Sequence, residues 1–168
     1  METFVTIILS VPVGIITSFI FLLIIYQLSR PRIQISNEIS HFKSDYYQIK
    51  VNNKTKFEII NVKAKLFRVK VSNIANGTLK THFEIKLENN ELFTLGRYES
   101  TSSHEDYGWR FKTKEDLRKY IQDGDFIKFQ IIAQNSYSNA IKVFEKRFDT
   151  LNQITEGTHV YGTEMTIR

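Results

Sequence analysis

The chain has 168 residues, of which 42% are hydrophobic and 24% are charged, and its formal net charge is +5 at pH 7. The absence of cysteine excludes a disulfide framework and cysteine-based zinc sites, and the seven scattered glycines form no phosphate-binding loop. The four histidines lack a metal-type spacing, and we find no pair of carboxylates suited to acid–base catalysis. An enzyme is therefore disfavoured, and neither a cofactor nor a metal ion is expected.

A long apolar segment dominates the N-terminal end. The run from Phe4 to Leu28 has no formally charged side chain. About 25 residues, rising about 1.5 Å each, can cross a hydrocarbon core of about 30 Å. A signal peptide would have a basic start, a shorter apolar run and a small-residue cleavage site, so the pattern favours an uncleaved anchor. We predict a transmembrane helix over residues 1–29.

The distribution of basic residues predicts the orientation of this helix. No Lys or Arg precedes it, whereas Arg30 and Arg32 follow it directly, so the positive-inside rule places the N-terminus outside and the following domain in the cytoplasm. We expect these two arginines to contact anionic lipid headgroups, which makes membrane lipid a predicted partner. The alternative topology places the domain outside the cell as an adhesion-type module.

Small residues recur every fourth position in the apolar segment. They lie along one side of the predicted helix, where they would let a second helix approach closely, and they are Thr6, Ser10, Gly14 and Ser18. The alternative is that Gly and Ser are ordinary components of membrane helices. The stripe predicts self-association into a homo-oligomer.

After Leu28 the hydrophobic period changes from that of a helix to that of β-strands. Predicted strands cover 32–36, 47–51, 62–66, 79–87, 92–95, 109–111, 126–134 and 140–148, with an edge strand within 154–167. A polar break is expected at 41–45 and a hairpin turn at Asn76-Gly77. In the strand after this turn, one buried face is predicted to consist of Leu79, Phe83, Ile85 and Leu87.

One short helix interrupts the predicted strands. Thr113 has the chemistry of an N-cap and Gly124 that of a C-terminal stop, which predicts a helix over 114–122. The fold class is therefore mainly β: a single N-terminal transmembrane helix followed by an antiparallel immunoglobulin-like β-sandwich with one short helix. We divide the chain into the helix (1–29), a basic juxtamembrane junction with the first strand (30–45), and the sandwich (46–168).

The polar segment 97–108 does not alternate and is predicted to be an exposed loop, a place where binding residues often lie. Its candidate ligand or partner residues are Arg97, Tyr98, His104, Tyr107 and Trp109. The sandwich is a candidate site for a protein or nucleotide ligand. The basic side chains of its strands could bind phosphates of lipid headgroups, of a nucleotide or of nucleic acid, or simply lie on solvated outer faces. Most Phe residues occupy buried strand positions, so binding of nucleic acid, which calls for exposed aromatic rings, is disfavoured.

The order of these segments resembles the inner helix and cytoplasmic domain of inward-rectifier potassium channels. The resemblance rests on Ser29-Arg30-Pro31-Arg32-Ile33-Gln34-Ile35-Ser36, Tyr47-Gln48-Ile49-Lys50-Val51-Asn52-Asn53 and Ile60-Asn61-Val62-Lys63-Ala64-Lys65-Leu66, and more loosely on the strands of 126–148. It implies a cytoplasmic immunoglobulin-like sandwich, tetrameric in those channels, with headgroup contact at Arg30 and Arg32. No pore helix or Gly-Tyr-Gly signature precedes Phe4, so we do not predict a potassium channel.

Two functions of different classes fit these features. In the first, a single-pass membrane protein binds a ligand or partner with its cytoplasmic sandwich and assembles its membrane helices, as a membrane-perturbing effector of a bacterial defence or stress pathway would. In the second, the chain is a passive membrane-anchored adaptor without pore activity.

Overall fold

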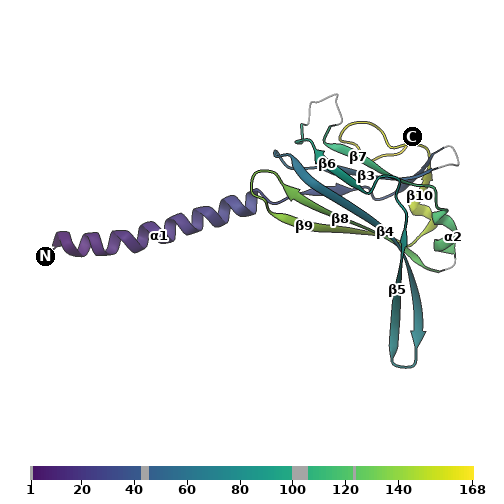
Figure 1. Cartoon of the computed structure of the whole chain (residues 1–168), viewed down its shortest axis with the longest axis horizontal. Helices are drawn as coiled ribbons and strands as arrows, with labels where there is room; N and C mark the ends of the chain where they lie inside the picture. The colour runs from purple at the N-terminus through teal and green to yellow at the C-terminus, as the bar shows by residue number, and fades with distance from the viewer. Residues whose placement is uncertain (1, 43–45, 100–105, 123) are drawn as a thin grey trace.

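The computed structural model describes residues 2–42, 46–99, 106–122 and 124–168 and contains a long helix that leads into a β-sandwich (Figure 1). Helix α1 spans Glu2–Leu28. Its segment Ser10–Leu28, with a mean hydropathy of 2.2, is long and apolar enough to cross a membrane. A signal sequence near an N-terminus meets the same criteria, so these properties identify a candidate membrane span.

One sheet, here called sheet A, has five strands, and its central strand is β3. Strands β1 and β2 pair end to end with one edge of β3, β7 pairs with its other edge, and β10 pairs with β2. The bounds are β1 Ile33–Ile35, β2 Ile39–Phe42, β3 Tyr46–Asn53, β7 Gly108–Thr113 and β10 Ile154–Glu156. The β10–β2 pair is parallel, whereas the other pairings of this sheet are antiparallel.

The second sheet, sheet B, also has five strands, all paired antiparallel. Strand β4 is central, and β5 and β6 pair with different parts of one of its edges. Strand β8 pairs with the other edge of β4, and β9 pairs with the far edge of β8. The bounds are β4 Ile59–Ile74, β5 Gly77–Ile85, β6 Glu91–Leu95, β8 Phe126–Asn135 and β9 Ile141–Phe148.

Apolar side chains from both sheets form the core. Phe111 of β7 and Phe129 of β8 are both buried, and their ring centroids lie 5.5 Å apart across the interior. Leu66 and Ile131 of sheet B and Ile49 of sheet A belong to the same buried cluster. The predicted fold class is confirmed: a mainly β chain with one N-terminal apolar helix, two layers of antiparallel strands and one short helix.

The outer face of sheet A is covered by the C-terminal segment, which the sequence did not predict. Lys50 of β3 is completely buried, and its ammonium donates hydrogen bonds to the carbonyl oxygens of Val160 at 2.5 Å, Gly162 at 2.9 Å and Glu164 at 3.0 Å. The alternation of β3 suggested a solvent-exposed polar face. Instead every residue from Tyr47 to Asn53 is buried, because residues 157–168 fold back over the strand.

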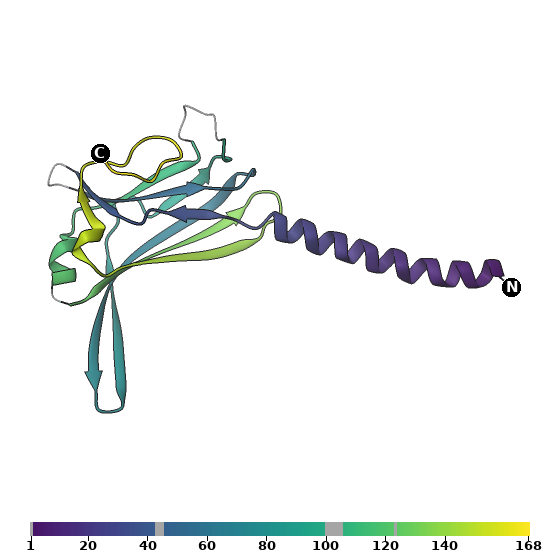
Figure 2. The ribbon, with the colours of Figure 1, turned by 180° about the vertical axis from the view of Figure 1, so that it is seen from behind.

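The β4–β5 hairpin differs from the prediction in two ways. Ile74 pairs with Gly77, so the turn is Ala75-Asn76, and Gly77 follows it with a φ of 140°. Leu79 and Phe83 were predicted to be buried, but they are 51% and 50% exposed. The hairpin extends past the sandwich beyond Val69, and Leu79 lies in this extension (Figures 1 and 2). Phe83 pairs with Arg68 at the base of the extension, on the edge strand β5.

Two further boundaries differ from the predicted ones. Helix α2 spans Leu117–Gln122 and begins three residues later than predicted, because the Thr113 hydroxyl accepts a hydrogen bond from the amide of Glu115 in a turn that precedes the helix. The Asp116 carboxylate then accepts the amide of Arg118 and acts as the cap. The predicted polar break at 41–45 is partly occupied by β2, and 43–45 lie outside the described residues. A short 3-10 helix, Leu151–Gln153, precedes β10.

Candidate membrane-proximal site and loop cleft

The end of α1 is attached to the sandwich by hydrogen bonds rather than by a free linker. Ser29 is buried; its hydroxyl donates to the carbonyl of Ile25, and its own carbonyl accepts a hydrogen bond from the hydroxyl of Ser138 in the β8–β9 turn. Three residues further on, the carbonyl of Arg32 accepts a hydrogen bond from the amide of Lys54 at 2.7 Å. The helix therefore leaves the domain in a defined direction.

A groove of ≈ 660 Å³ lies beside this junction, and we call it the junction groove. One part of its wall is apolar and continuous with α1, while another part is basic. Its main lining residues are Ile25, Leu28, Arg32, Lys54, Lys56, Phe57 and Tyr137. The rings of Phe57 and Tyr137 stack with centroids 5.0 Å apart and hold the two loops that carry them together.

This arrangement suits an amphipathic anion at a membrane surface. Apolar residues from the last turns of α1 can contact acyl chains, whereas three cationic side chains can contact a phosphate. Arg32 was predicted to make such contacts, and Lys54 and Lys56 are brought beside it by the turn after β3. Arg30 is not among the residues that line the groove; its guanidinium lies 5.1 Å from the ring centroid of Tyr26 in α1.

We expect Arg32→Gln and Lys56→Gln each to weaken binding of an anionic phospholipid about fivefold, the equivalent of about 1 kcal/mol for each cation near a charged leaflet. The measurement is the retention of phosphatidylglycerol by the detergent-solubilised full chain in native mass spectrometry. Lys119→Gln is the matched control, because this exposed lysine lies in α2, at the end of the domain away from α1 (Figure 1). Equal losses in all three variants would contradict a localised site.

The predicted binding loop is divided between two places. Arg97, Tyr107 and Trp109 line a cleft of ≈ 590 Å³, here called the loop cleft, together with Glu58, Leu92, Glu99 and Asp106. Trp109 is 36% exposed, whereas Tyr107 is 1% exposed and therefore does not fit the predicted exposed loop. Arg97 pairs with Glu99 at 2.7 Å. His104 lies outside the described residues.

Tyr98 points from this loop toward the junction groove. Its amide donates to the carbonyl of Thr55, and the Lys54 ammonium lies 4.6 Å from the centroid of its ring. The same ring packs edge-on against Tyr107 at 5.6 Å. A second connection is the buried amide of Asn53, whose nitrogen donates to the carbonyls of Phe57 and Gly96 at 2.8 Å each. The loop cleft and the junction groove therefore share neighbouring side chains.

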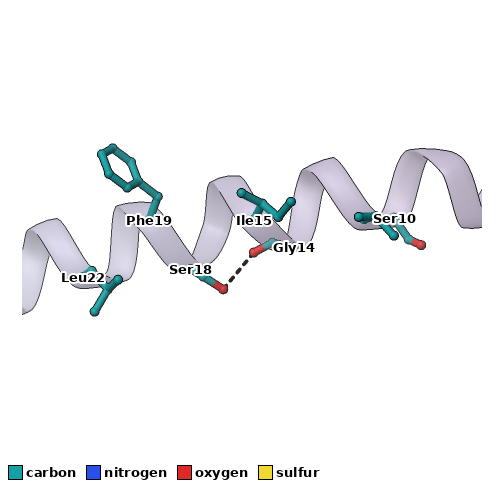
Figure 3. Close-up of a pocket in the computed structure, with 7 residues that line it drawn as sticks. Ser10, Gly14, Ile15, Ser18, Phe19 and Leu22 are labelled. Carbon is teal, nitrogen blue, oxygen red and sulfur yellow. Dashed lines mark hydrogen bonds between the residues drawn. The ribbon is translucent and has the colours of Figure 1, made fainter.

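The small residues of α1 lie along one side of the helix (Figure 3). Ser10, Gly14 and Ser18 form a shallow groove of ≈ 520 Å³ with the neighbouring apolar side chains, and the Ser18 hydroxyl donates to the carbonyl of Gly14 at 2.8 Å. A Cβ atom added to Gly14 would meet nothing within 4 Å. Thr6 occupies the next position of the stripe, in the part of α1 whose side chains are not described.

Sequence reasoning did not identify Lys54, Lys56, Phe57 and Tyr137 as parts of a site. They come from two turns about 80 residues apart, so no local pattern connects them. Lys54, Lys56 and Phe57 lie in a basic turn directly after β3, and this turn is the sequence feature that could have indicated them.

Comparison with known proteins identifies no family. No family model matches the chain, and no curated protein matches it. Among solved structures, a structure of murine CRIg matches with a TM-score of 0.35 and 6% sequence identity, over 77% of this chain and 99% of that one. No family match supports a relationship to inward-rectifier potassium channels.

Proposed function

We propose that this chain is a single-pass membrane protein whose sandwich binds a ligand or partner in the loop cleft and assembles the membrane helices. The observation that best supports this proposal is the hydrogen-bonded junction at Ser29 and Arg32. A domain that is fixed to its helix can determine how neighbouring membrane helices are arranged. We place the domain in the cytoplasm, since the cations of the junction groove follow α1.

The proposed mechanism runs from the loop cleft to the membrane. A ligand bound beside Trp109 would contact Tyr107, which lines the same cleft. Tyr107 packs edge-on against Tyr98, and the Lys54 ammonium of the junction groove lies over the Tyr98 ring. Repositioning of Lys54 would change how the end of α1 meets anionic lipid. Clustered helices would then perturb the membrane, as an effector of a bacterial defence or stress pathway does.

The ligand class is a protein segment or a nucleotide. The loop cleft combines an aromatic side chain, Trp109, with one arginine and three carboxylates. A nucleotide would stack on Trp109 and place its phosphate against Arg97, whereas a basic peptide would pair with the carboxylates. The excess of carboxylates favours the peptide.

Gly14→Leu is expected to weaken self-association of the full chain by about tenfold or more, because a large side chain prevents close approach of two helices at the small-residue stripe. The mass of the nanodisc-embedded protein measures this directly. If the effector mechanism operates, the same substitution also abolishes depolarisation of cells that express the activated protein.

The control is Ile16→Leu, a volume-neutral change on the opposite side of α1. A discrete oligomer in the wild type and in this control, with loss only in Gly14→Leu, supports helix assembly. A wild-type monomer without effect on cells contradicts the effector function and favours a passive membrane-anchored adaptor.

A further inference from the structure

The β4–β5 hairpin projects from the domain as a two-stranded arm. Strand β4 pairs with β8 only as far as Val69, opposite Phe126, and beyond this residue its described partner is β5 alone. Both views show the arm leaving the sandwich at a steep angle to α1, from the end of the domain that lies away from the helix (Figures 1 and 2). In a membrane-anchored chain, this direction points toward neighbouring molecules.

The arm carries apolar side chains that the described residues leave about half exposed. Ile74, Leu79 and Phe83 lie on one face of the ribbon according to the pairing register, and they are 54%, 51% and 50% exposed. A two-stranded ribbon is marginally stable in water on its own, and uncovered apolar surface of this kind marks interaction sites. The arm therefore has the properties of a segment that docks on a partner.

The charge of the arm is complementary to that of the loop cleft. Residues 70–83 contain Lys70 and Lys80 and no acidic residue. The loop cleft has the carboxylates of Glu58, Glu99 and Asp106 against the single guanidinium of Arg97, and it presents apolar surface at Leu92 and Trp109. It thus offers both kinds of contact that the arm requires.

We infer that the arm of one copy binds the loop cleft of a second copy of this chain. The strands that border the cleft, β6 and β7, lie on the side of the domain opposite to the arm in both views (Figures 1 and 2). The interface is therefore heterologous: each copy gives an arm on one side and receives one on the other. Such contacts form a ring when the rotation between neighbouring copies closes, and a ring would place the α1 helices side by side.

This inference deepens the proposed function, because it names the protein partner of the loop cleft as the chain itself. It changes the role of the cleft: an external ligand of the cleft would compete with the arm of the neighbour. Leu79, near the end of the arm, is expected to enter the cleft, whereas Lys80, which lies on the opposite face of the ribbon, would contact a carboxylate at the rim of the cleft.

Cysteine cross-linking of the full chain in membranes tests the arrangement, since the natural sequence has no cysteine. One tagged copy carries Lys80→Cys, a second, differently tagged copy carries Glu58→Cys, and both positions are exposed. We expect mild oxidation to form a disulfide between the two tags about tenfold more efficiently than in a control pair, because docking raises the local thiol concentration. The control combines Lys80→Cys with Lys142→Cys, an exposed position on β9.

A charge exchange provides the second measurement. Lys80→Glu should raise the concentration at which the oligomer dissociates by about tenfold or more, and combination with Glu58→Lys should restore it. Cross-linking only between two arms, or an oligomer without arm–cleft disulfides, would overturn this inference and leave helix assembly intact. A full chain that is monomeric in nanodiscs would overturn both proposals.

Discussion

Replacement of Lys50 by methionine is expected to lower the free energy of unfolding by about 3 kcal/mol, because each hydrogen bond from a charged donor contributes about 1.5–3 kcal/mol and part of this contribution is offset when the buried charge is removed. The ammonium supplies hydrogen bonds to three carbonyl oxygens of the C-terminal segment, at Val160, Gly162 and Glu164. Methionine preserves most of the side-chain volume but donates no hydrogen bond. The three carbonyls would lose this donor, and the contact that holds residues 157–168 against β3 would be weakened.

Guanidinium denaturation of the full chain in detergent measures this loss, with the single tryptophan, Trp109 of β7, as the fluorescent reporter. Limited proteolysis should also show faster cleavage between 157 and 168 in the variant. Lys119→Met is the control, because this lysine is exposed on α2 and methionine forms helix as readily as lysine. A loss below about 1 kcal/mol in Lys50→Met would contradict a structural role for the buried ammonium.

The sequence predicted what depends on local periodicity. The apolar run of α1, the alternation in β4 and β8 and the turn residues between strands are encoded within a few positions of one another. These signals were sufficient for the fold class and for most strands. They also predicted Arg32 as a binding cation directly after the apolar helix, and this residue lines the junction groove.

The remaining features depend on contacts between distant residues. The polar alternation of β3 is normally that of a strand with one solvated face, and only the return of residues 157–168 buries Lys50. In the same way, Leu79 has the spacing of a core position, and only the projection of the arm past β8 leaves it exposed. The junction groove combines two turns that no sequence pattern relates.

Acidification between pH 6.5 and 4 is expected to destabilise the protein through His159. This residue is 1% exposed, and burial lowers its pKa from 6.5 to about 4, with a further contribution from repulsion by the cations of Lys50 and Arg110. In the unfolded chain the imidazole has its ordinary pKa and binds a proton below pH 6.5. The unfolded state therefore binds more protons in this window, so its free energy falls relative to that of the folded state as the pH decreases.

The expected loss on moving from pH 7 to pH 4 is about 3 kcal/mol, because each unit of pKa difference corresponds to about 1.4 kcal/mol. Above pH 6.5 both states hold a neutral imidazole, and His159 contributes no pH dependence there. Denaturation curves at several pH values, for the natural chain and for His159→Phe, isolate this contribution. Phenylalanine keeps a ring at this position but cannot be protonated.

The difference between the two pH profiles is the decisive quantity, because two carboxylates also lose stabilising contacts in acid. A hydrogen bond from His41 lowers the pKa of Glu156, and a hydrogen bond from Tyr47 lowers the pKa of Asp116. These contacts persist in His159→Phe, so their effect cancels. We expect the stability of the variant to fall less steeply between pH 6.5 and 4. Parallel profiles would contradict this prediction, because they would show that the imidazole of His159 has the same pKa in the folded and the unfolded chain.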